Sequence, residues 1–122
     1  MEFYAHLDEH HSPEVLQHQL SIDSLPRFCA SIDKVLENNI DRGRIYCVWG
    51  EFSVQRENIN GGVRFTLPSC PNAVAWTITS GHPPDPQQTV IHFTINRPQH
   101  DQDFIDSIEI FVADWLKGLQ QL

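Results

Sequence analysis

The sequence predicts an α+β domain: an antiparallel four-stranded meander, with or without a fifth strand at the N-terminus, carrying an N-terminal and a C-terminal amphipathic helix on one face. Three observations lead to this prediction. Apolar residues recur at helical spacing before residue 40 and after residue 103, and they alternate with polar residues in between. An Asn60-Gly61 pair, typical of a tight turn, lies within that alternating stretch. A chain of 122 residues is one domain by length.

The first elements are short. Phe3, Ala5 and Leu7 alternate with more polar residues, which predicts a strand over residues 1–7. Ser12 followed by Pro13 is typical of a helix N-cap and first helical position, so a helix is predicted from there to about residue 20. A longer helix is predicted over residues 23–42, because apolar residues recur there every three or four positions. Those residues are Leu25, Phe28, Cys29, Ile32, Val35, Leu36 and Ile40.

From Gly43 the period changes to two, which predicts one strand that runs as far as the Asn60-Gly61 turn. A two-residue type I′ turn at that pair would place Val54 opposite Leu67 and Glu57 opposite Arg64. Three further strands follow the same alternation, over residues 63–67, 74–79 and 91–96. Residues 81–86 are rich in proline and are predicted to form a loop.

The C-terminal helix has the clearest pattern. Asp101 or Asp103 can cap it, and its apolar residues form one stripe. The stripe consists of Phe104, Ile105, Ile108, Phe111, Val112, Trp115, Leu116 and Leu119. We expect both helices to cover one face of the sheet, so that Phe65, Trp76 and Phe93 point toward Phe111 and Trp115.

Composition excludes several classes of function. The net charge is −8 and the eight Lys and Arg residues are scattered, which argues against a nucleic-acid partner. No apolar run approaches the roughly 20 residues that span a bilayer, so no membrane partner is expected. The acidic N-terminus lacks the basic region of a secretory signal, which favours the cytoplasm. Three cysteines without a C-x-x-C pair predict neither a disulfide framework nor a cofactor.

The N-terminal histidines are the one candidate metal site. His6, His10, Glu14 and His18 are spaced four apart, with His11 beside them, and on one continuous helix they would share a face. Pro13 argues against this arrangement, because it would start the helix and leave the first histidines outside it. A polar terminus without bound metal is therefore the simpler interpretation.

A second candidate site lies on the polar face of the predicted sheet. Arg64, His92, Thr77 and Glu51 would share that face, and such a set could bind a small anion or transfer protons. The simpler interpretation is an ordinary solvated sheet face, since β-branched Thr is common in strands.

Trp49 is the best candidate for an interface. It follows Ile45 and Cys47 on the same side of its predicted strand, and an exposed patch of these three residues would suit a protein partner or a second copy of the chain. The alternative is that the N-terminal segment or a loop covers them.

No pattern identifies an enzyme. Cys70 is the only cysteine predicted to lie in a loop, and neither a helix N-terminus nor a family signature accompanies it. No catalytic residue is therefore assigned, and the sequence favours a non-catalytic binding or interaction module, self-associating as a homodimer through the Trp49 patch or an edge strand. The alternative is a small-ligand-binding protein or an enzyme with a cleft between the C-terminal helix and the sheet.

The order of the elements resembles that of the helix-grip ligand-binding folds, in which a long C-terminal helix closes over a curved antiparallel sheet. Fewer strands are predicted here than those folds contain, and a fold does not by itself give a function. A core packed solid between Trp76, Phe93, Phe111 and Trp115 would argue against an internal pocket.

Overall fold

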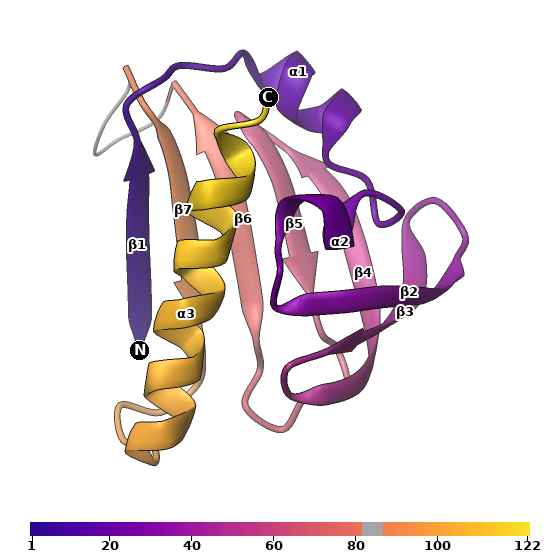
Figure 1. Ribbon diagram of the computed structural model, residues 1–122, viewed down its shortest axis with the longest axis vertical. Helices are drawn as coiled ribbons and strands as arrows, with labels where there is room; N and C mark the ends of the chain where they lie inside the picture. Colours follow the sequence, from indigo (N-terminus) through magenta and orange to yellow (C-terminus); the bar gives the residue numbers. More distant parts are fainter. Residues whose placement is uncertain (82–86) are drawn as a thin grey trace.

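The computed structural model describes residues 1–81 and 87–122, and it shows one antiparallel sheet of seven strands that curves around a long C-terminal helix (Figure 1). The elements are β1 Glu2–Leu7, α1 Pro13–Gln19, α2 Leu25–Phe28, β2 Ile32–Asn38, β3 Arg42–Cys47, β4 Gly50–Ile59, β5 Gly62–Thr66, β6 Ala75–Ser80, β7 Thr89–Thr94 and α3 Gln102–Leu119. The strand order is β1-β7-β6-β5-β4-β3-β2, so β1 and β2 form the two edges. The predicted proline-rich loop falls largely on residues 82–86, outside the described residues.

The predicted four-stranded meander with a long N-terminal helix is wrong. Only Leu25–Phe28 of the predicted helix is helical, and Ile32–Asn38 forms the edge strand β2. The register of β2 against β3 shifts twice, and the first shift, between Ile32 and Lys34, lets Ile32 and Val35 both face the core although they are three residues apart. A β-bulge inserts one extra residue and turns the spacing of a strand from two into three. The first shift therefore imitates helical spacing.

The single strand predicted from Gly43 to the turn is also wrong, because a hairpin divides it into β3 and β4. Cys47 pairs with Gly50, which leaves Val48 and Trp49 in the turn. The inward side of the chain changes across that turn, from Ile45 and Cys47 to Phe52 and Val54. This change explains why apolar residues occur on both sides of the single strand that the sequence predicts.

Several local predictions are confirmed. Residues 2–7 form β1, and Ser12 caps α1 by accepting a hydrogen bond from the Val15 amide at 3.2 Å. Glu57 pairs with Arg64 across β4 and β5, as the hairpin register predicts. Gly61 has a φ of +94° whereas Asn60 is not among the residues with positive φ, so the turn is not type I′.

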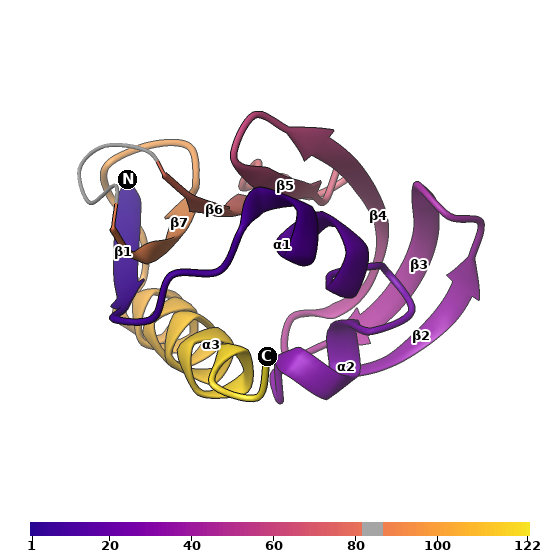
Figure 2. The same ribbon diagram turned by 90° about the horizontal axis from the view of Figure 1, so that it is seen from above.

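Aromatic rings fill the space between α3 and the concave side of the sheet. Phe65, Trp76 and Phe93 face Phe111 and Trp115, as predicted. The Trp76 ring centroid lies 5.0 Å from that of Phe111 and 5.4 Å from that of Phe65. Seen from above, all three helices lie inside the curve of the sheet, and its outer side carries none of them (Figure 2). None of the described helices combines the length and apolar character needed to cross a membrane.

Candidate functional site

An apolar cleft of about 330 Å³ lies between β1 and α3. One wall is the edge strand, with Phe3, Tyr4 and Ala5. The other wall is a stripe of α3 with helical spacing, formed by Glu109, Val112, Ala113 and Leu116. The two elements lie side by side along most of the length of β1 (Figure 1).

The local sequence explains why this stripe remains beside the sheet. Ile108, Phe111 and Trp115 are buried against the strands, so the next stripe around the helix reaches the flank at β1. Phe3 fixes the facing strand, because its ring meets that of Phe93 edge to face at 6.1 Å. One feature of the sequence could have indicated the cleft. The apolar stripe of α3 includes Leu116, which lies outside the part of the helix that is buried against the strands. The sequence predictions missed the cleft residues as a site.

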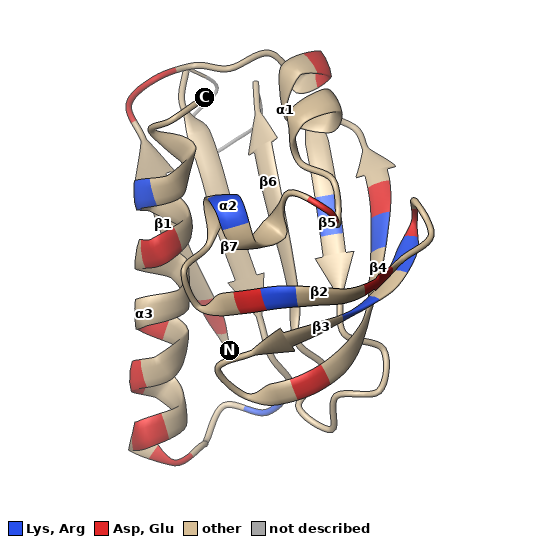
Figure 3. Cartoon of the chain, turned by 45° about the vertical axis from the view of Figure 1, so that its right-hand side comes forward, with Lys and Arg blue, Asp and Glu red and all other residues tan. Residues whose placement is uncertain are grey.

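The surroundings of the cleft are acidic. A second cavity of about 430 Å³ continues past Leu116, where Asp8 and Glu9 line it together with His6. Glu109 is the one charged residue of the first cavity, and neither lining contains a Lys or Arg among the described residues. Acidic residues recur along the exposed side of α3, with Lys117 near its end (Figure 3). The cleft therefore combines apolar walls with negative potential.

The predicted polar-face set is partly brought together. Cross-strand pairing puts Arg64, Thr77 and His92 in one row on β5, β6 and β7. Glu51 lies apart on β4, where it pairs with Arg44. The charged members have partners: the Arg64 Nε donates to Glu57 at 2.6 Å, and the His92 Nε2 lies 2.9 Å from the Glu2 carboxylate. Ligand binding by this set stays a prediction.

The expected apolar patch around Trp49 is not exposed. Ile45 and Cys47 are buried, and Trp49 is half-buried with its ring centroid 4.9 Å from that of Phe111. Its indole Nε1 donates a hydrogen bond to the Ser107 hydroxyl at 2.8 Å. The premise of the interface prediction is wrong because the β3–β4 turn folds Trp49 back over the end of the core. Self-association itself stays a prediction.

The N-terminal histidines do not converge. Pro13 begins α1, so His6 lies on β1, His10 and His11 lie in the connection, and Glu14 and His18 lie on the helix. Within residues 1–81 and 87–122, no group of three or more His, Cys, Asp or Glu side chains is placed to hold a metal. Metal binding by these residues stays a prediction that the described geometry does not support.

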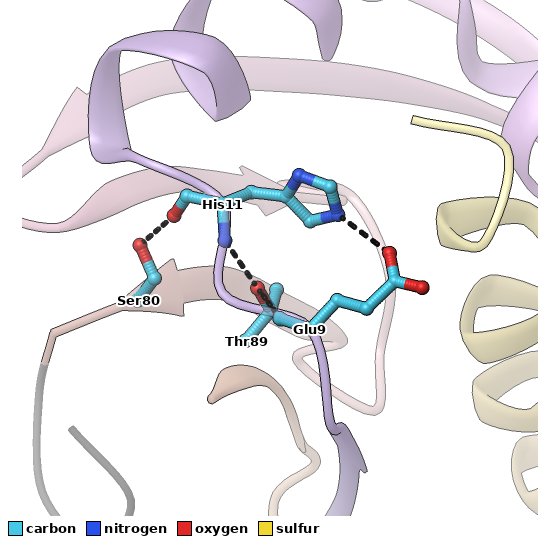
Figure 4. A network of polar contacts seen from close by, with 4 residues as sticks. All are labelled: Glu9, His11, Ser80 and Thr89. Carbon is cyan, nitrogen blue, oxygen red and sulfur yellow. Dashed lines mark hydrogen bonds and ion pairs between the residues drawn. The ribbon is translucent and has the colours of Figure 1, made fainter. Parts of the chain in front are cut away.

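Buried hydroxyls hold the connection between β1 and α1 against the ends of β6 and β7 (Figure 4). The Ser80 hydroxyl donates to the His11 carbonyl, and the Thr89 hydroxyl donates to the Glu9 carbonyl at 3.0 Å. The His11 ring instead lies 3.6 Å from the Glu9 carboxylate. Because Ser80 bonds a carbonyl and not the imidazole, the cluster holds no nucleophile–base pair. Its role is to fix the chain where it leaves β1.

The buried thiols offer no activated nucleophile. Burial raises the pKa of the Cys29 thiol to about 12, and the Cys29 side chain has no exposed surface. Burial likewise raises the pKa of Cys47. A catalytic thiolate needs a lowered pKa, so neither residue suits nucleophilic catalysis.

The centre of the fold is filled. The ring centroids of Phe93 and Phe111 are 5.4 Å apart and those of Trp76 and Trp115 are 6.4 Å apart, and all four side chains are at most 1% exposed. No preformed pocket therefore lies between these four rings. Both tryptophan indole N–H groups are buried without an acceptor among the described residues. Of the predicted cleft between the C-terminal helix and the sheet, the structure therefore shows only the part that lies at β1, among the described residues.

No protein-family model and no curated protein matches this chain. Among solved structures, it is similar to the protein XoxI from Bacillus cereus, with a TM-score of 0.64 and 17% identity over 99% of this chain and 92% of that one. It is also similar to an uncharacterised protein from Bacillus thuringiensis, with a TM-score of 0.62 and 16% identity over 99% of this chain and 96% of that one.

A START superfamily protein from Mycobacterium smegmatis gives a TM-score of 0.59 and 12% identity, over 99% of this chain and 94% of that one. Identities this low show the fold alone. The likeness also overturns the predicted four-stranded meander, because it extends over almost the whole of both chains. The chain thus has the curved antiparallel sheet and closing C-terminal helix of a START-like fold.

Proposed function

We propose that this chain binds an apolar ligand that carries a positive charge, in the cleft between β1 and α3. The observation that carries the proposal is the cleft itself, whose walls are largely apolar and whose one charged side chain among the described residues is Glu109. The START-like fold supports a ligand-binding role over the self-associating module that the sequence favours. No catalytic step is proposed.

The size and chemistry of the cleft define the ligand class. Ligand sites in proteins span roughly 300–1,000 Å³, and the volume of about 330 Å³ is near the lower end. The Phe3, Val112 and Leu116 side chains would remove apolar ligand surface from water, at about 25 cal/mol for each Å². The Glu109 carboxylate would favour an ammonium over a neutral or anionic head group. A short amphiphilic amine fits both features.

Three probes with one alkyl chain and different head groups test the proposal: decylamine, decanol and decanoate, each below its micelle concentration. We expect decylamine to bind most tightly and decanoate most weakly, by calorimetry and by amide chemical-shift changes along β1 and α3. The difference between amine and alcohol should be about fivefold, the size expected of a solvent-exposed charge pair worth up to 1 kcal/mol.

Two isosteric substitutions on α3 isolate the head-group contact. Glu109→Gln should lower decylamine affinity to that of decanol, whereas Asp103→Asn, exposed on the same helix outside the cleft, should leave the order unchanged. Equal affinity for decylamine and decanoate, or shift changes confined to other parts of the chain, would count against the proposed function.

A further inference from the structure

The outer edge of β1 offers main-chain hydrogen-bonding groups beside the cleft. The Met1 amino group donates to the Ile95 carbonyl, and the Ile95 amide donates to the Met1 carbonyl, both at 3.0 Å. Residues of an antiparallel pair alternate between hydrogen-bonded and non-hydrogen-bonded positions. The N–H and C=O groups of Glu2 and Tyr4 are therefore directed away from β7, toward the open edge.

The two edges of the sheet differ in how they are protected. β2 has two register shifts and a lysine, Lys34, and bulges and lysines are common means of preventing edge-to-edge pairing. β1 pairs with β7 in unbroken register from Glu2 to Leu7. A regular edge strand that borders an apolar cleft is the arrangement that receives an added strand.

We propose that the occupant of the cleft is an extended peptide segment with basic side chains, which pairs with β1 as an additional strand. This inference rests on the proposed function and names its ligand. Alternate side chains of the added strand would point toward α3, where Ala113 is small and exposed and Leu116 is apolar. The main-chain groups of Glu2 and Tyr4 would supply the pairing.

The acidic residues around the cleft favour a basic peptide over a second copy of this chain as the occupant. Asp8, Glu9 and Glu109 line the two adjoining cavities, and Glu2 lies on the same edge strand. Pairing of β1 with the β1 of a second copy would bring two such acidic sets together, in a protein whose net charge is −8. Like charges at close range oppose association, whereas lysine or arginine side chains complement these acids.

The experiment compares three synthetic peptides of equal length. One alternates lysine and valine, one alternates glutamate and valine, and one is the lysine peptide with N-methyl groups on the alternate amides that would face β1. We expect the lysine peptide to shift the amide resonances of Glu2, Tyr4 and Ala113. The glutamate and N-methylated peptides should bind at least tenfold more weakly, because the first carries the opposite charge and the second lacks the main-chain donors.

Substitutions at Tyr4 separate main-chain pairing from side-chain contact. Tyr4→Pro removes an N–H at the outer edge without removing a bond to β7, and should weaken the lysine peptide at least tenfold. Tyr4→Ala removes the same ring but keeps the N–H, and should change affinity less than threefold. If Tyr4→Pro does not fold, Ala113→Arg blocks the cleft by bulk and charge without altering β1, and should abolish peptide binding.

The outcomes distinguish this inference from the proposed function. Decylamine binding without lysine-peptide binding overturns the peptide and leaves the proposed function standing. Equal binding of the N-methylated peptide overturns strand addition. If sedimentation shows a dimer, and Tyr4→Pro makes it monomeric, the occupant is a second copy of the chain and the basic-peptide proposal is wrong. Failure of both decylamine and the lysine peptide overturns the inference and the proposed function together.

Discussion

Ile40 lies at the tip of the β2–β3 hairpin in a conformation that β-branched residues rarely adopt. Its φ is +67° and its side chain is 80% exposed, so no packing offsets the backbone strain. The left-handed conformation brings Cβ close to the following carbonyl, at a cost of roughly 1–2 kcal/mol for an ordinary residue. Asparagine tolerates this conformation because its side chain bonds locally.

We expect Ile40→Asn to raise the free energy of unfolding by about 1 kcal/mol, since the strain falls and little buried area is lost. Urea denaturation measures the change. Ile40→Val is the matched control, because valine keeps the β-branch, and it should leave stability unchanged. A fall in stability for Ile40→Asn would show that the exposed isoleucine makes a stabilising contact.

The buried Cys29 thiol should make the free energy of unfolding depend on pH in the alkaline range. Its pKa is about 12 in the folded chain, against an ordinary value of 9.0, because burial penalises the thiolate. Between these two values the unfolded chain releases the proton and the folded chain keeps it. The unfolded state then binds fewer protons, so stability falls as pH rises, by about 1.4 kcal/mol for each pH unit.

Stability measured by urea denaturation, with reductant, at about pH 8 and about pH 10 should therefore fall more for the natural chain than for Cys29→Ala. The difference should approach about 1–2 kcal/mol. Cys70→Ala, at a half-buried loop thiol, is the control and should follow the natural chain. The same pH dependence with and without the Cys29 thiol would contradict the expected linkage.

At the scale of elements, the contact between α2 and α3 depends on Gly118. A Cβ at this position would lie 1.8 Å from the Phe28 carbonyl oxygen, so only glycine permits the observed approach of the two helices. Glycine lowers helix propensity by about 1 kcal/mol relative to alanine. In the last turn of α3, the close packing against α2 therefore outweighs the low helix propensity of glycine.

Gly118→Ala should lower the free energy of unfolding by about 2 kcal/mol, because overpacking costs more than the gain in helix propensity. Lys117→Ala, exposed and adjacent, should change it by less than about 0.5 kcal/mol. Guanidinium denaturation compares the two variants. Stabilisation by Gly118→Ala would mean that α2 moves aside at little cost.

Local signals predicted some elements and misled on others. α1 and α3 were predictable because capping residues and a repeat of three to four are properties of neighbouring residues. β2 was not, because the register shift after Ile32 places Ile32 and Val35 at helical spacing, and only pairing with β3 reveals that shift. The β3–β4 turn was missed for a related reason: Val48 and Trp49 are apolar and carry no turn signal of their own.

At the scale of the whole molecule, one aromatic cluster joins α3 to the sheet. Phe111 lies at its centre, and its ring centroid is 4.9 Å from that of Trp49, 5.0 Å from that of Trp76 and 5.4 Å from that of Phe93. Such ring pairs add about 0.5–1.5 kcal/mol each beyond the area they bury. The cluster holds α3 at its present distance from β1, and so it also sets the width of the cleft.

Phe111→Ala should lower the free energy of unfolding by about 3–5 kcal/mol, the range for deletion of a buried phenylalanine side chain. Ile110→Ala removes a neighbouring side chain that is 59% exposed, and should cost less than about 0.5 kcal/mol. Thermal and urea unfolding of both variants test the difference. Equal effects would mean that the core does not depend on this ring.

The sequence by itself determined the elements whose signals are local: β1, α1, the Glu57–Arg64 register and the apolar stripe of α3. Only the tertiary structure decided that Phe3, Glu109 and Leu116 share a cleft, because residues about a hundred positions apart meet there. It also decided that Trp49 turns inward and that β1 is an edge. The physical reason is that periodicity shows which side of an element is apolar, whereas strand order and helix placement determine which apolar surfaces are covered.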